Sequence, residues 1–577
     1  MIKKILYKFV VFLPILLILV GTLPAITSII RPGYFAMHDD LQAMRQLEMD
    51  NCFHDLQIPC RWVLDMGYGY GYPLFNYYPP MPYYLGEVIH LLGFSFLDTV
   101  KVLFVLVFVL SALTMYLFAS QFWGKLGGAV SALFYIWGSY HATDIYVRGA
   151  MNESWALVWF PAILWGIYKI IKTEKWKYVV SSSFFIAMLF LSHNPILMVF
   201  APGALLWALF LIWREKKLKS VFKLFIVGAW SFSLAAFFTI PVIFEQKFAH
   251  VETLTIGYFN YLAHFVDLNQ LFINVNWGYG ASELGPNDGM SFHLGYLHWI
   301  ISFIALAIAL FFWTKKKTVS TLIVFFFFWT YGYAFLMHVR SSLIWRTITP
   351  LLYLQFPWRM LGLSLLGTSF LAGSVMSIFP KNLKFLKFTL GIVLILAVIL
   401  INRNFFTWRE FYPSMNDQTK FSGKLWELQR TSGIFDYLPI WAQLPPADPA
   451  NGNAQFLTGK GEYLTEKKVT NFQQFKVKVD SDSAILQINT FYFPGWEAFI
   501  NGKKVEIDPK KDKDLGRIII DFKKGDYIID LKFNETPIRL ASDYLSCLAW
   551  IVFLGFLFFE FAGMVKKNYR CFIMFKR

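Results

Sequence analysis

Charged residues are scarce in this chain of 577 residues: Asp, Glu, Lys and Arg together make up only 16% of it, whereas hydrophobic residues make up 56%. So few charges exclude a disordered chain, and a mean hydropathy of +0.48 excludes a soluble cytosolic enzyme. The sequence therefore predicts a membrane protein. Its 21 Trp and 29 Tyr agree, because both residue types are favoured where a membrane meets water.

Acidic residues are fewer than basic ones, 37 against 53, which gives a net charge of +16. A basic surplus is also found in nucleic-acid-binding proteins, but here most Lys and Arg lie in short loops between apolar runs. That distribution is typical of the cytoplasmic loops of membrane proteins. We therefore expect membrane lipids, and no nucleic acid, as partners.

Cysteine is also rare, with four residues, and the sequence has no Cys-x-x-Cys pair and no His cluster. Both absences argue against a zinc site. Cys52 and Cys60 lie in the same predicted outer loop, where an oxidising exterior allows a disulfide, but the sequence leaves their pairing open. No nucleotide-binding motif is present either, because the glycine-rich stretch at 66–80 lacks the strand and the Lys-Ser/Thr of a phosphate loop.

Apolar runs long enough to cross a hydrocarbon core of about 30 Å predict about twelve membrane-spanning helices. These runs lie near 5–30, 101–120, 126–141, 154–171, 178–193, 195–213, 222–243, 293–313, 319–338, 359–379, 387–402 and 544–564. The alternative for the first run is a cleaved signal peptide, but its length and the lack of a clean Ala-x-Ala site favour a retained anchor.

Basic residues set the predicted topology. Lys3, Lys4 and Lys8 precede the first run, which places the N-terminus in the cytoplasm, and alternation then gives a cytoplasmic C-terminus. The inside loops carry Lys169, Lys172, Lys175, Lys177, Arg214, Lys216, Lys217, Lys219, Lys315 to Lys317, Lys381, Lys384, Lys566, Lys567 and Arg570. This topology predicts a multi-pass plasma-membrane protein. The polar residues that could bind a substrate or take part in catalysis fall on its extracytoplasmic face.

Three regions follow from this topology: a transmembrane module at 1–402 with a large first outer loop at 31–82, an extracytoplasmic β-rich domain at 403–543, and a terminal helix with a basic tail at 544–577. Short alternating runs such as 475–479 and 518–522 predict a β-sandwich-like domain. Asn501-Gly502 predicts a hairpin, and 523–526 predicts a second turn.

The first outer loop opens on His38, Asp39 and Asp40. Repulsion between adjacent carboxylates raises the pKa of one of them, which suits a general base. The alternative is a solvated cap at the start of a helix.

A second outer loop places Asp144, Arg148 and Glu153 close together in sequence. An Arg here can hold a phosphate through two hydrogen bonds, and the carboxylates can orient an acceptor hydroxyl or a metal. The alternative is a structural ion pair at a helix end. Arg359, at the outer end of another span, can hold a lipid phosphate. Snorkelling of its side chain toward the membrane surface would equally explain an Arg at this position.

Tyrosines dominate the stretch at 66–80, among them Tyr70, Tyr77 and Tyr78. Aromatic faces can stack on sugar rings or sit among lipid headgroups. Composition alone favours the headgroup alternative.

Four of these motifs together resemble bacterial membrane proteins of the GT-C glycosyltransferase superfamily. They are the His-Asp loop, Gly-Tyr-Gly-Tyr-Pro-Leu-Phe-Asn-Tyr-Tyr-Pro-Pro at 69–80, Arg-Gly-Ala-x-x-Glu at 148–153 and Gln-Phe-Pro-Trp-Arg at 355–359. Phe491-Tyr-Phe-Pro-Gly-Trp-Glu-Ala-Phe-Ile-Asn-Gly-Lys-Lys-Val is similar to the outer β domain of such proteins. The chain resembles most the group labelled 6-pyruvoyl-tetrahydropterin synthase-related membrane proteins, and the resemblance covers most of its length.

The resemblance implies a mainly helical GT-C-like fold and transfer of a sugar from a polyprenyl-phosphate-linked donor to a glycan, lipid or protein acceptor outside the cell. Asp39 matches the essential carboxylate of the first outer loop, with Asp40 beside it, and Glu153 with Arg148 matches the second loop. We expect Asp39, Asp40 and Glu153 to be catalytic and His38, Asp144, Arg148 and Arg359 to bind substrate with the three tyrosines. Adjacent rather than spaced aspartates argue against a divalent cation without excluding one, and the sequence identifies no certain cofactor.

Two other functions remain open. A lipid or polysaccharide transporter would need polar residues near the middle of the membrane, whereas the charges here gather at outer helix ends. A catalytically silent cell-envelope assembly protein would tolerate loss of Asp39 and depend on the β-rich domain instead.

Overall fold

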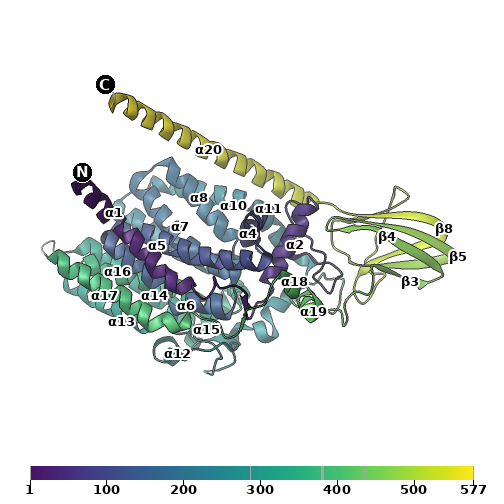
Figure 1. The fold of residues 1–577 in the computed structure, drawn as a ribbon, viewed down its shortest axis with the longest axis horizontal. Coiled ribbons are helices and arrows are strands. Elements are labelled where there is room, and N and C mark those ends of the chain that lie inside the picture. The colour runs from purple at the N-terminus through teal and green to yellow at the C-terminus, as the bar shows by residue number, and fades with distance from the viewer. Residues whose placement is uncertain (1, 286, 378–382, 434–435, 576–577) are drawn as a thin grey trace. The chain divides into compact units, whose positions relative to one another are not determined.

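The computed structural model describes residues 2–285, 287–377, 383–433 and 436–575, with side chains between 13 and 560. The chain is mainly helical and forms one larger β-sheet between α17 and α20 (Figure 1). Its residues group into two compact units. The helical unit comprises Met1–Gln42, Leu97–Val227 and Leu254–Asn416, and the mixed unit comprises Ala43–Phe96, Gly228–Thr253 and Asp417–Arg577.

Seven helices among the described residues are long and apolar enough to cross a membrane. They form where the sequence is apolar for 18 residues or more, since a helix satisfies every backbone polar group internally. They are α5 (Phe96–Ile136), α7 (Met151–Thr173), α9 (Asn194–Glu215), α14 (Lys317–Leu336), Pro357–Ser377 with α16 (Leu361–Ser374), Lys384–Phe405 with α17 (Lys384–Asn402), and Pro537–Glu560 in α20 (Pro537–Phe575).

The predicted number of twelve spans is not confirmed. One helix, α5, runs through two predicted spans at 101–120 and 126–141, with a break at Gly124, whose φ of +72° is not helical. The shorter apolar helices are Leu13–Ile26 in α1 (Ile2–Ile26), α8 (Trp176–Phe190) and α13 (Tyr296–Phe311). The run at 222–243 forms two helices, α10 (Ser220–Leu234) and α11 (Ala236–Glu245), in a pair bent by 77°. Apolar composition marks burial in lipid or protein, but it does not determine how long each helix continues.

The side chains of the two termini, and Lys381 entirely, lie outside the described residues. The predicted orientation of the termini therefore stays a prediction from the sequence.

Close packing of α5 against α16 forms the core of the helical unit. A side chain at Gly373 would overlap Ser131 and the backbone of Gly127, so this approach requires glycine. Nearer the start of α5, the ring of Phe118 stacks on Phe370 of α16 with centroids 4.8 Å apart. The ring of Phe326 in α14 also packs on Phe370, with centroids 4.2 Å apart. The close approach at the glycines and the packing of these rings together fix how the helices meet.

A short antiparallel pair joins the first outer loop to the segment after α17. It consists of β1 (Tyr34–Phe35) and β2 (Phe411–Tyr412). Residues 403–416 thus belong to the helical unit, although the sequence groups them with the outer domain.

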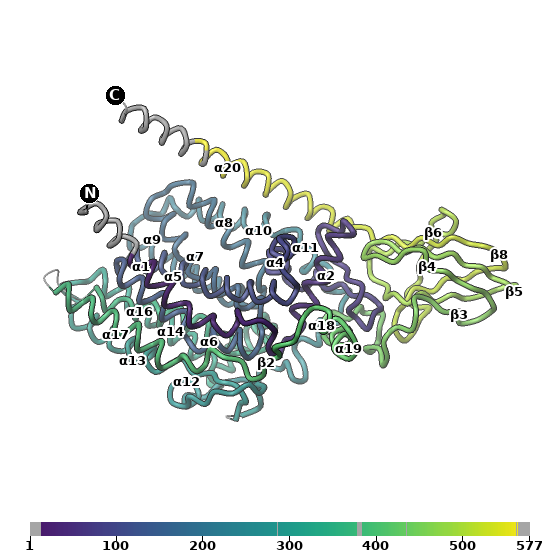
Figure 2. The backbone as a smooth tube through the Cα atoms, in the orientation of Figure 1, coloured from purple at the N-terminus to yellow at the C-terminus, as the bar shows by residue number. Residues whose placement is uncertain are grey.

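The mixed unit contains a single six-stranded antiparallel sheet in the order β3-β5-β8-β6-β7, with β4 also paired to β5. The strands are β3 (Ala454–Thr458), β4 (Gly461–Val469), β5 (Phe472–Phe491), β6 (Trp496–Ile500), β7 (Lys503–Val505) and β8 (Arg517–Phe533). The long strands β5 and β8 run side by side (Figure 2). The sequence predicts two packed sheets, and the structure replaces them with one continuous sheet because these strands are 20 and 17 residues long.

Of the two predicted turns, the first is confirmed. Asn501 and Gly502 connect β6 to β7 with φ values of +47° and +78°, as a two-residue hairpin requires. The second is wrong, because β8 continues through 523–526. Its pairing with β5 shifts register there, between Val479 and Ser483 of β5, so the Lys-Lys-Gly-Asp sequence marks a bulge rather than a turn.

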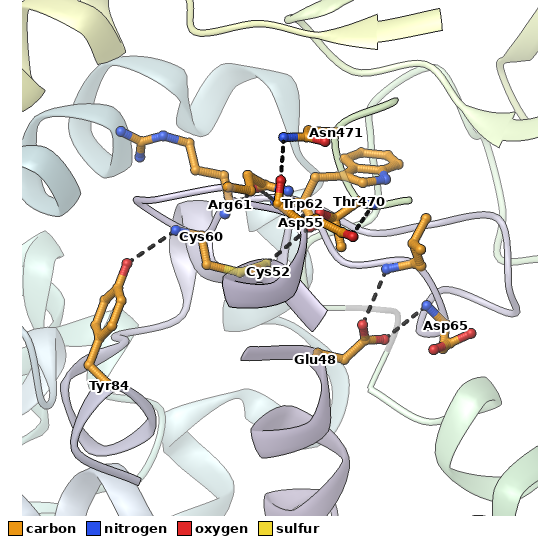
Figure 3. The surroundings of a disulfide bond; sticks show 12 residues. Glu48, Cys52, Asp55, Cys60, Arg61, Trp62, Asp65, Tyr84, Thr470 and Asn471 are labelled. Atoms are coloured by element: carbon orange, nitrogen blue, oxygen red, sulfur yellow. Dashed lines mark hydrogen bonds between the residues drawn. A yellow bond between two sulfur atoms is a disulfide. The ribbon is translucent and has the colours of Figure 1, made fainter. Parts of the chain in front are cut away.

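Cys52 and Cys60 form a disulfide with Cα atoms 5.5 Å apart, at the end of α2 (Gln42–His54) (Figure 3). Within the mixed unit, this loop contacts the sheet domain through Asp55, whose carboxylate accepts a hydrogen bond of 2.7 Å from the backbone N–H of Thr470 and whose carbonyl accepts one of 3.1 Å from Asn471. The disulfide therefore closes the loop that holds these two contacts.

Buried charges anchor α20 within the mixed unit. Arg61 donates to Glu535 and Asp543 at 2.9 and 2.7 Å, and Arg539 donates to Glu245 of α11 at 2.8 Å. The side chains of Arg539 and Glu245 are 0% and 1% exposed. Burying such charges is costly unless they are paired, so these contacts fix the start of α20.

Candidate functional site

Arg148 lies at the centre of a buried charge cluster in the helical unit. Its guanidinium contacts Asp144 Oδ1 at 2.5 Å and Glu153 Oε2 at 2.8 Å. The two carboxylate side chains are 0% and 1% exposed, whereas that of Arg148 is 11% exposed. The cluster therefore buries its negative groups and leaves part of a cation accessible.

Arg359 is the second cation of the cluster. Its Nε lies 3.2 Å from Glu153 Oε2, the same oxygen that Arg148 contacts, and its side chain is 12% exposed. Its Nη1 donates to the carbonyl of Leu354 and to Gln355 Oε1 at 2.8 and 3.0 Å. One buried carboxylate oxygen thus lies between two guanidiniums, which we call the paired-arginine site (Asp144, Arg148, Glu153 and Arg359).

Local backbone structure brings these residues together. Asp144 lies in a π-helical turn, Thr143–Val147, and Glu153 lies in the first turn of α7, where a negative charge is favoured by the helix dipole. Between them, Gly149 has a φ of +62°, and a side chain at this position would overlap Met37. Glycine therefore allows the sharp turn that places Asp144 and Glu153 on the same guanidinium.

A buried tyrosine completes the contacts of Glu153. The hydroxyl of Tyr140, in α6 (Ser139–Ala142), donates to Glu153 Oε1. By contrast, Asp144 Oδ2 accepts no hydrogen bond from the described residues, although this oxygen is buried. A buried acceptor without a donor is costly, so Asp144 Oδ2 is suited to a donor from outside the chain or to a proton.

The charge of the paired-arginine site depends on Asp144. Burial, together with the negative charge of Glu153, raises the pKa of Asp144 well above its ordinary 3.8 and outweighs Arg148. Burial opposes the charge of Arg148, but Glu153 and Asp144 raise its pKa above the ordinary value, so it stays cationic. Protonation of Asp144, which the raised pKa favours, would leave two guanidiniums facing one carboxylate and give the site an excess positive charge.

Aromatic rings support both cations. The guanidinium of Arg148 lies 4.6 Å from the ring centroid of Trp358, and that of Arg359 lies 4.9 Å from the ring of Phe356. The indole Nε1 of Trp358 donates to Ser282 Oγ at 3.1 Å. These contacts help to hold the two guanidiniums in place.

The first outer loop is attached to this site through its backbone. The N–H groups of His38 and Asp39 donate to the carbonyls of Val147 and Arg148 at 3.0 and 2.9 Å. Gln42 Nε2 donates to Asp39 Oδ2 at 2.9 Å and to the carbonyl of Gly149 at 2.8 Å. The structure therefore places Asp39 one backbone hydrogen bond from Arg148, with its carboxylate held by Gln42.

His38 and Asp40 lie on either side of Asp39. His38 is exposed, and its Nε2 is 2.9 Å from the carbonyl of Tyr279, so it joins a third loop to the same region. Asp40 is half-buried and lies near enough to Tyr34 to act on it electrostatically.

The three predicted substrate-binding tyrosines belong to the mixed unit. Tyr70 and Tyr77 are only 7% and 4% exposed; Tyr70 packs 5.2 Å from Phe491, and the Tyr77 hydroxyl donates to the carbonyl of Glu245. Tyr78 is half-buried under the guanidinium of Arg45. Their rings fill the interior of this unit, which argues against the headgroup alternative that composition favours.

Three residues of the site are not predicted from the sequence: Tyr140, Gln42 and Trp358. A weak signal existed for Gln42, because Asp39-Asp40-Leu41-Gln42 has the spacing of a capping box. Trp358 stands next to Arg359 in sequence, yet its ring supports Arg148 instead. No signal in the sequence pairs Tyr140 with Glu153. Among the described residues no group of three or more His, Cys, Asp or Glu could hold a metal ion.

Comparisons with known proteins give limited matches. No family profile matches the chain. An uncharacterized protein from Lactococcus lactis subsp. cremoris (strain MG1363) is 25% identical over 188 residues, which are 31% of this chain and 31% of that protein.

Three solved structures, all of the Archaeoglobus fulgidus oligosaccharyltransferase, are also similar. The structure with an inhibitory peptide and a dolichol-phosphate has a TM-score of 0.39 at 13% identity over 69% of this chain and 56% of that one. The structure tethered to an acceptor peptide has a TM-score of 0.42 at 11% identity over 70% and 56%. The structure with Zn and sulfate has a TM-score of 0.34 at 14% identity over 69% and 54%. The matched part spans about half of those chains, and TM-scores at this level do not establish a shared fold.

Proposed function

We propose that this protein is a membrane glycosyltransferase of the GT-C type, which transfers a sugar from a polyprenyl-phosphate-linked donor to an acceptor on the extracytoplasmic face of the cell membrane. The observation that carries the proposal is the paired-arginine site, in which the guanidiniums of Arg148 and Arg359 contact one oxygen of Glu153. The motif resemblance stated above supports the same activity. The pterin synthase-related group remains the proposed relationship within that superfamily.

Electrostatics support an anionic substrate at this site. Protonation of Asp144, which its raised pKa favours, would leave one excess positive charge among buried groups, where screening by water is weak. Two planar guanidiniums, whose side chains are 11% and 12% exposed, match the oxygens of a phosphate. Because both lie at ends of apolar helices, the phosphate of a lipid carrier fits better than that of a soluble nucleotide.

The reaction we propose is an in-line displacement with inversion. The acceptor hydroxyl oxygen forms a bond to the anomeric carbon, and its proton passes to the carboxylate of Asp39. The bond between the anomeric carbon and the phosphate oxygen breaks, and the polyprenyl phosphate leaves with the bonding electrons. Arg148 and Arg359 stabilise the negative charge that develops on that oxygen.

Four further residues have roles in this scheme. Glu153 holds the two guanidiniums at a spacing set by its Oε2 atom, and Gln42 is a positioning residue for the base, because it donates to Asp39 and to the carbonyl of Gly149. Asp40 and His38 would orient the acceptor. Nothing in the scheme requires a metal or cofactor.

The test is release of polyprenyl phosphate by the full chain in lipid nanodiscs. Undecaprenyl phosphate carrying glucose, mannose or N-acetylglucosamine serves as donor, with glycan, lipid and peptide acceptors. We expect release by the wild type, a loss of at least 100-fold in Asp39→Asn, consistent with removal of a general base, and a comparable loss in Arg148→Lys. Asp98→Asn and Arg409→Lys are matched controls, since both change exposed side chains of the same unit.

Release that persists in Asp39→Asn would exclude this residue as the base. A wild type that binds undecaprenyl phosphate and moves it between leaflets, without releasing sugar from any donor, would favour the transporter. If Asp39→Asn and Arg148→Lys both complement a deletion strain, the silent assembly protein becomes the better interpretation.

A further inference from the structure

A polar cavity of about 260 Å³ lies within the helical unit, in the segment between α11 and α13. Its lining includes Gln270, Asn274, Asn276, Asn287, Asp288 and Phe292. Its volume is slightly below the roughly 300 Å³ at which pockets begin to hold drug-sized ligands, so it suits a ligand of about one ring.

The chemistry of the lining selects a neutral ligand rich in hydroxyl groups. Four carboxamide side chains offer both donors and acceptors, which a sugar hydroxyl also has. None of the described lining residues is Lys or Arg, and Asp288 would repel an anion. The ring of Phe292 adds an apolar surface of the kind on which a sugar face packs.

The cavity is held in shape by hydrogen bonds. Asp288 Oδ1 accepts from the backbone N–H of Glu283 at 2.7 Å, and Oδ2 accepts from Gln270 Nε2 at 2.6 Å. The side-chain amides of Asn276 and Asn287 make no hydrogen bond to any described residue. These two amides are therefore available to a ligand, and their removal would leave the internal contacts of the chain intact.

A stack of three groups connects the cavity to the paired-arginine site. Phe292, in the lining, stacks on Trp358 with ring centroids 5.1 Å apart at 25°. The same indole also stacks on Phe356 with centroids 4.9 Å apart and lies under the guanidinium of Arg148 at 4.6 Å. A phosphate bound at Arg148 would thus lie near Trp358, whose ring also contacts the lining of the cavity.

We propose that this cavity is a sugar-binding subsite, which takes one pyranose ring next to a phosphate held by Arg148. The inference rests on the proposed function and adds to it the residues that recognise the sugar, Asn276 and Asn287. The same ring chemistry could come from the sugar of the lipid-linked donor or from a sugar of the acceptor.

Equilibrium binding to the full chain in nanodiscs tests the subsite. The probes are undecaprenyl phosphate alone, undecaprenyl phosphate carrying glucose, mannose or N-acetylglucosamine, and soluble oligosaccharides of these sugars. The variant is Asn276→Ala with Asn287→Ala, and the control is Asn269→Ala, an exposed asparagine of α12 (Leu268–Phe272) that does not line the cavity.

We expect the double variant to bind a sugar-bearing probe about 10-fold more weakly, as for two lost hydrogen bonds, and bare undecaprenyl phosphate equally well. An effect on the lipid-linked probes assigns the cavity to the donor sugar, and an effect on the oligosaccharides alone assigns it to the acceptor. Unchanged affinity for every sugar-bearing probe overturns the subsite, while release of polyprenyl phosphate by the wild type would still support the proposed function.

Failure of the proposed function can also be told apart from failure of the subsite. Oligosaccharide binding that depends on Asn276 and Asn287, in a protein that releases no polyprenyl phosphate, would retain the sugar site and overturn the glycosyltransferase. A wild type that binds no sugar-bearing probe overturns both.

Discussion

The guanidinium carbon of Arg148 lies over the indole of Trp358, 4.6 Å from the ring centroid. The two residues are far apart in sequence, and the ring belongs to the segment that also contributes Arg359. The contact stabilises a cation in a buried place and orients its edge toward Glu153. Recognition of an anion at Arg148 should therefore depend on a residue that need not touch the anion.

The first prediction concerns that ring. Trp358→Leu removes the cation–π contact, worth about 0.5–2 kcal/mol, and should weaken binding of undecaprenyl phosphate by roughly 2- to 30-fold. The control is Trp345→Leu, which removes another fully buried indole of the same unit. Both variants should lose thermal stability, but only Trp358→Leu should lose affinity. Equal affinities in the two variants would show that the ring only fills space.

The second prediction concerns Glu153. Glu153→Gln leaves two buried guanidiniums without their shared counter-charge and should destabilise the protein by about 3–5 kcal/mol, measured as a lower thermal midpoint in nanodiscs. Glu215→Gln is the matched control, because Glu215 pairs with the half-exposed Lys172 and such pairs are worth about 0–1 kcal/mol. Adding Arg359→Gln to Glu153→Gln should restore part of the loss, since it removes one uncompensated charge.

Much of the site could be anticipated from sequence, because short-range patterns carry it. Asp144, Arg148 and Glu153 lie within ten residues, and a turn at Gly149 suffices to bring them together. The hairpin at Asn501-Gly502 is a local signal of the same kind. In both cases the backbone geometry is determined by residues adjacent in the chain.

Long-range relationships could not be anticipated. The attachment of Arg359 to Glu153 joins residues about 200 positions apart, and no pattern in either segment specifies the partner. The single sheet and the continuous β8 were also missed, because Lys-Lys-Gly-Asp is equally compatible with a turn and with a bulge between long strands. Tertiary packing decides such alternatives.

The third prediction concerns pH. Because burial and Glu153 raise the pKa of Asp144, the folded protein keeps a proton there that the unfolded chain loses near pH 4. The bound proton therefore stabilises the folded state fully below about pH 4. As the pH rises from there through the folded-state pKa, the free energy of unfolding falls by about 1.4 kcal/mol per pH unit. Thermal midpoints should therefore fall less steeply between pH 5 and 8 in Asp144→Asn than in the wild type. A slope in Asp144→Asn equal to that of the control Asp98→Asn would contradict a protonated Asp144.

The fourth prediction concerns the disulfide of the mixed unit. Cys52 and Cys60 are separated by eight positions, and closing a loop of that size stabilises a fold by roughly 2.5 kcal/mol in the chain-entropy estimate. Cys52→Ala with Cys60→Ala should lower the thermal midpoint, and a reductant should do the same to the wild type but not to the double variant. Cys547→Ala is the control, because this cysteine is exposed and free.

That loss should also reach the sheet domain, since Asp55 inside the closed loop accepts hydrogen bonds from Thr470 and Asn471. Amide hydrogen exchange near the start of β5 should be faster in the double variant than in Cys547→Ala. Faster exchange confined to the loop itself would mean that the disulfide stabilises only its own residues. In that case Asp55 alone would hold the contact, and Asp55→Asn should reproduce the change at β5 with the disulfide intact.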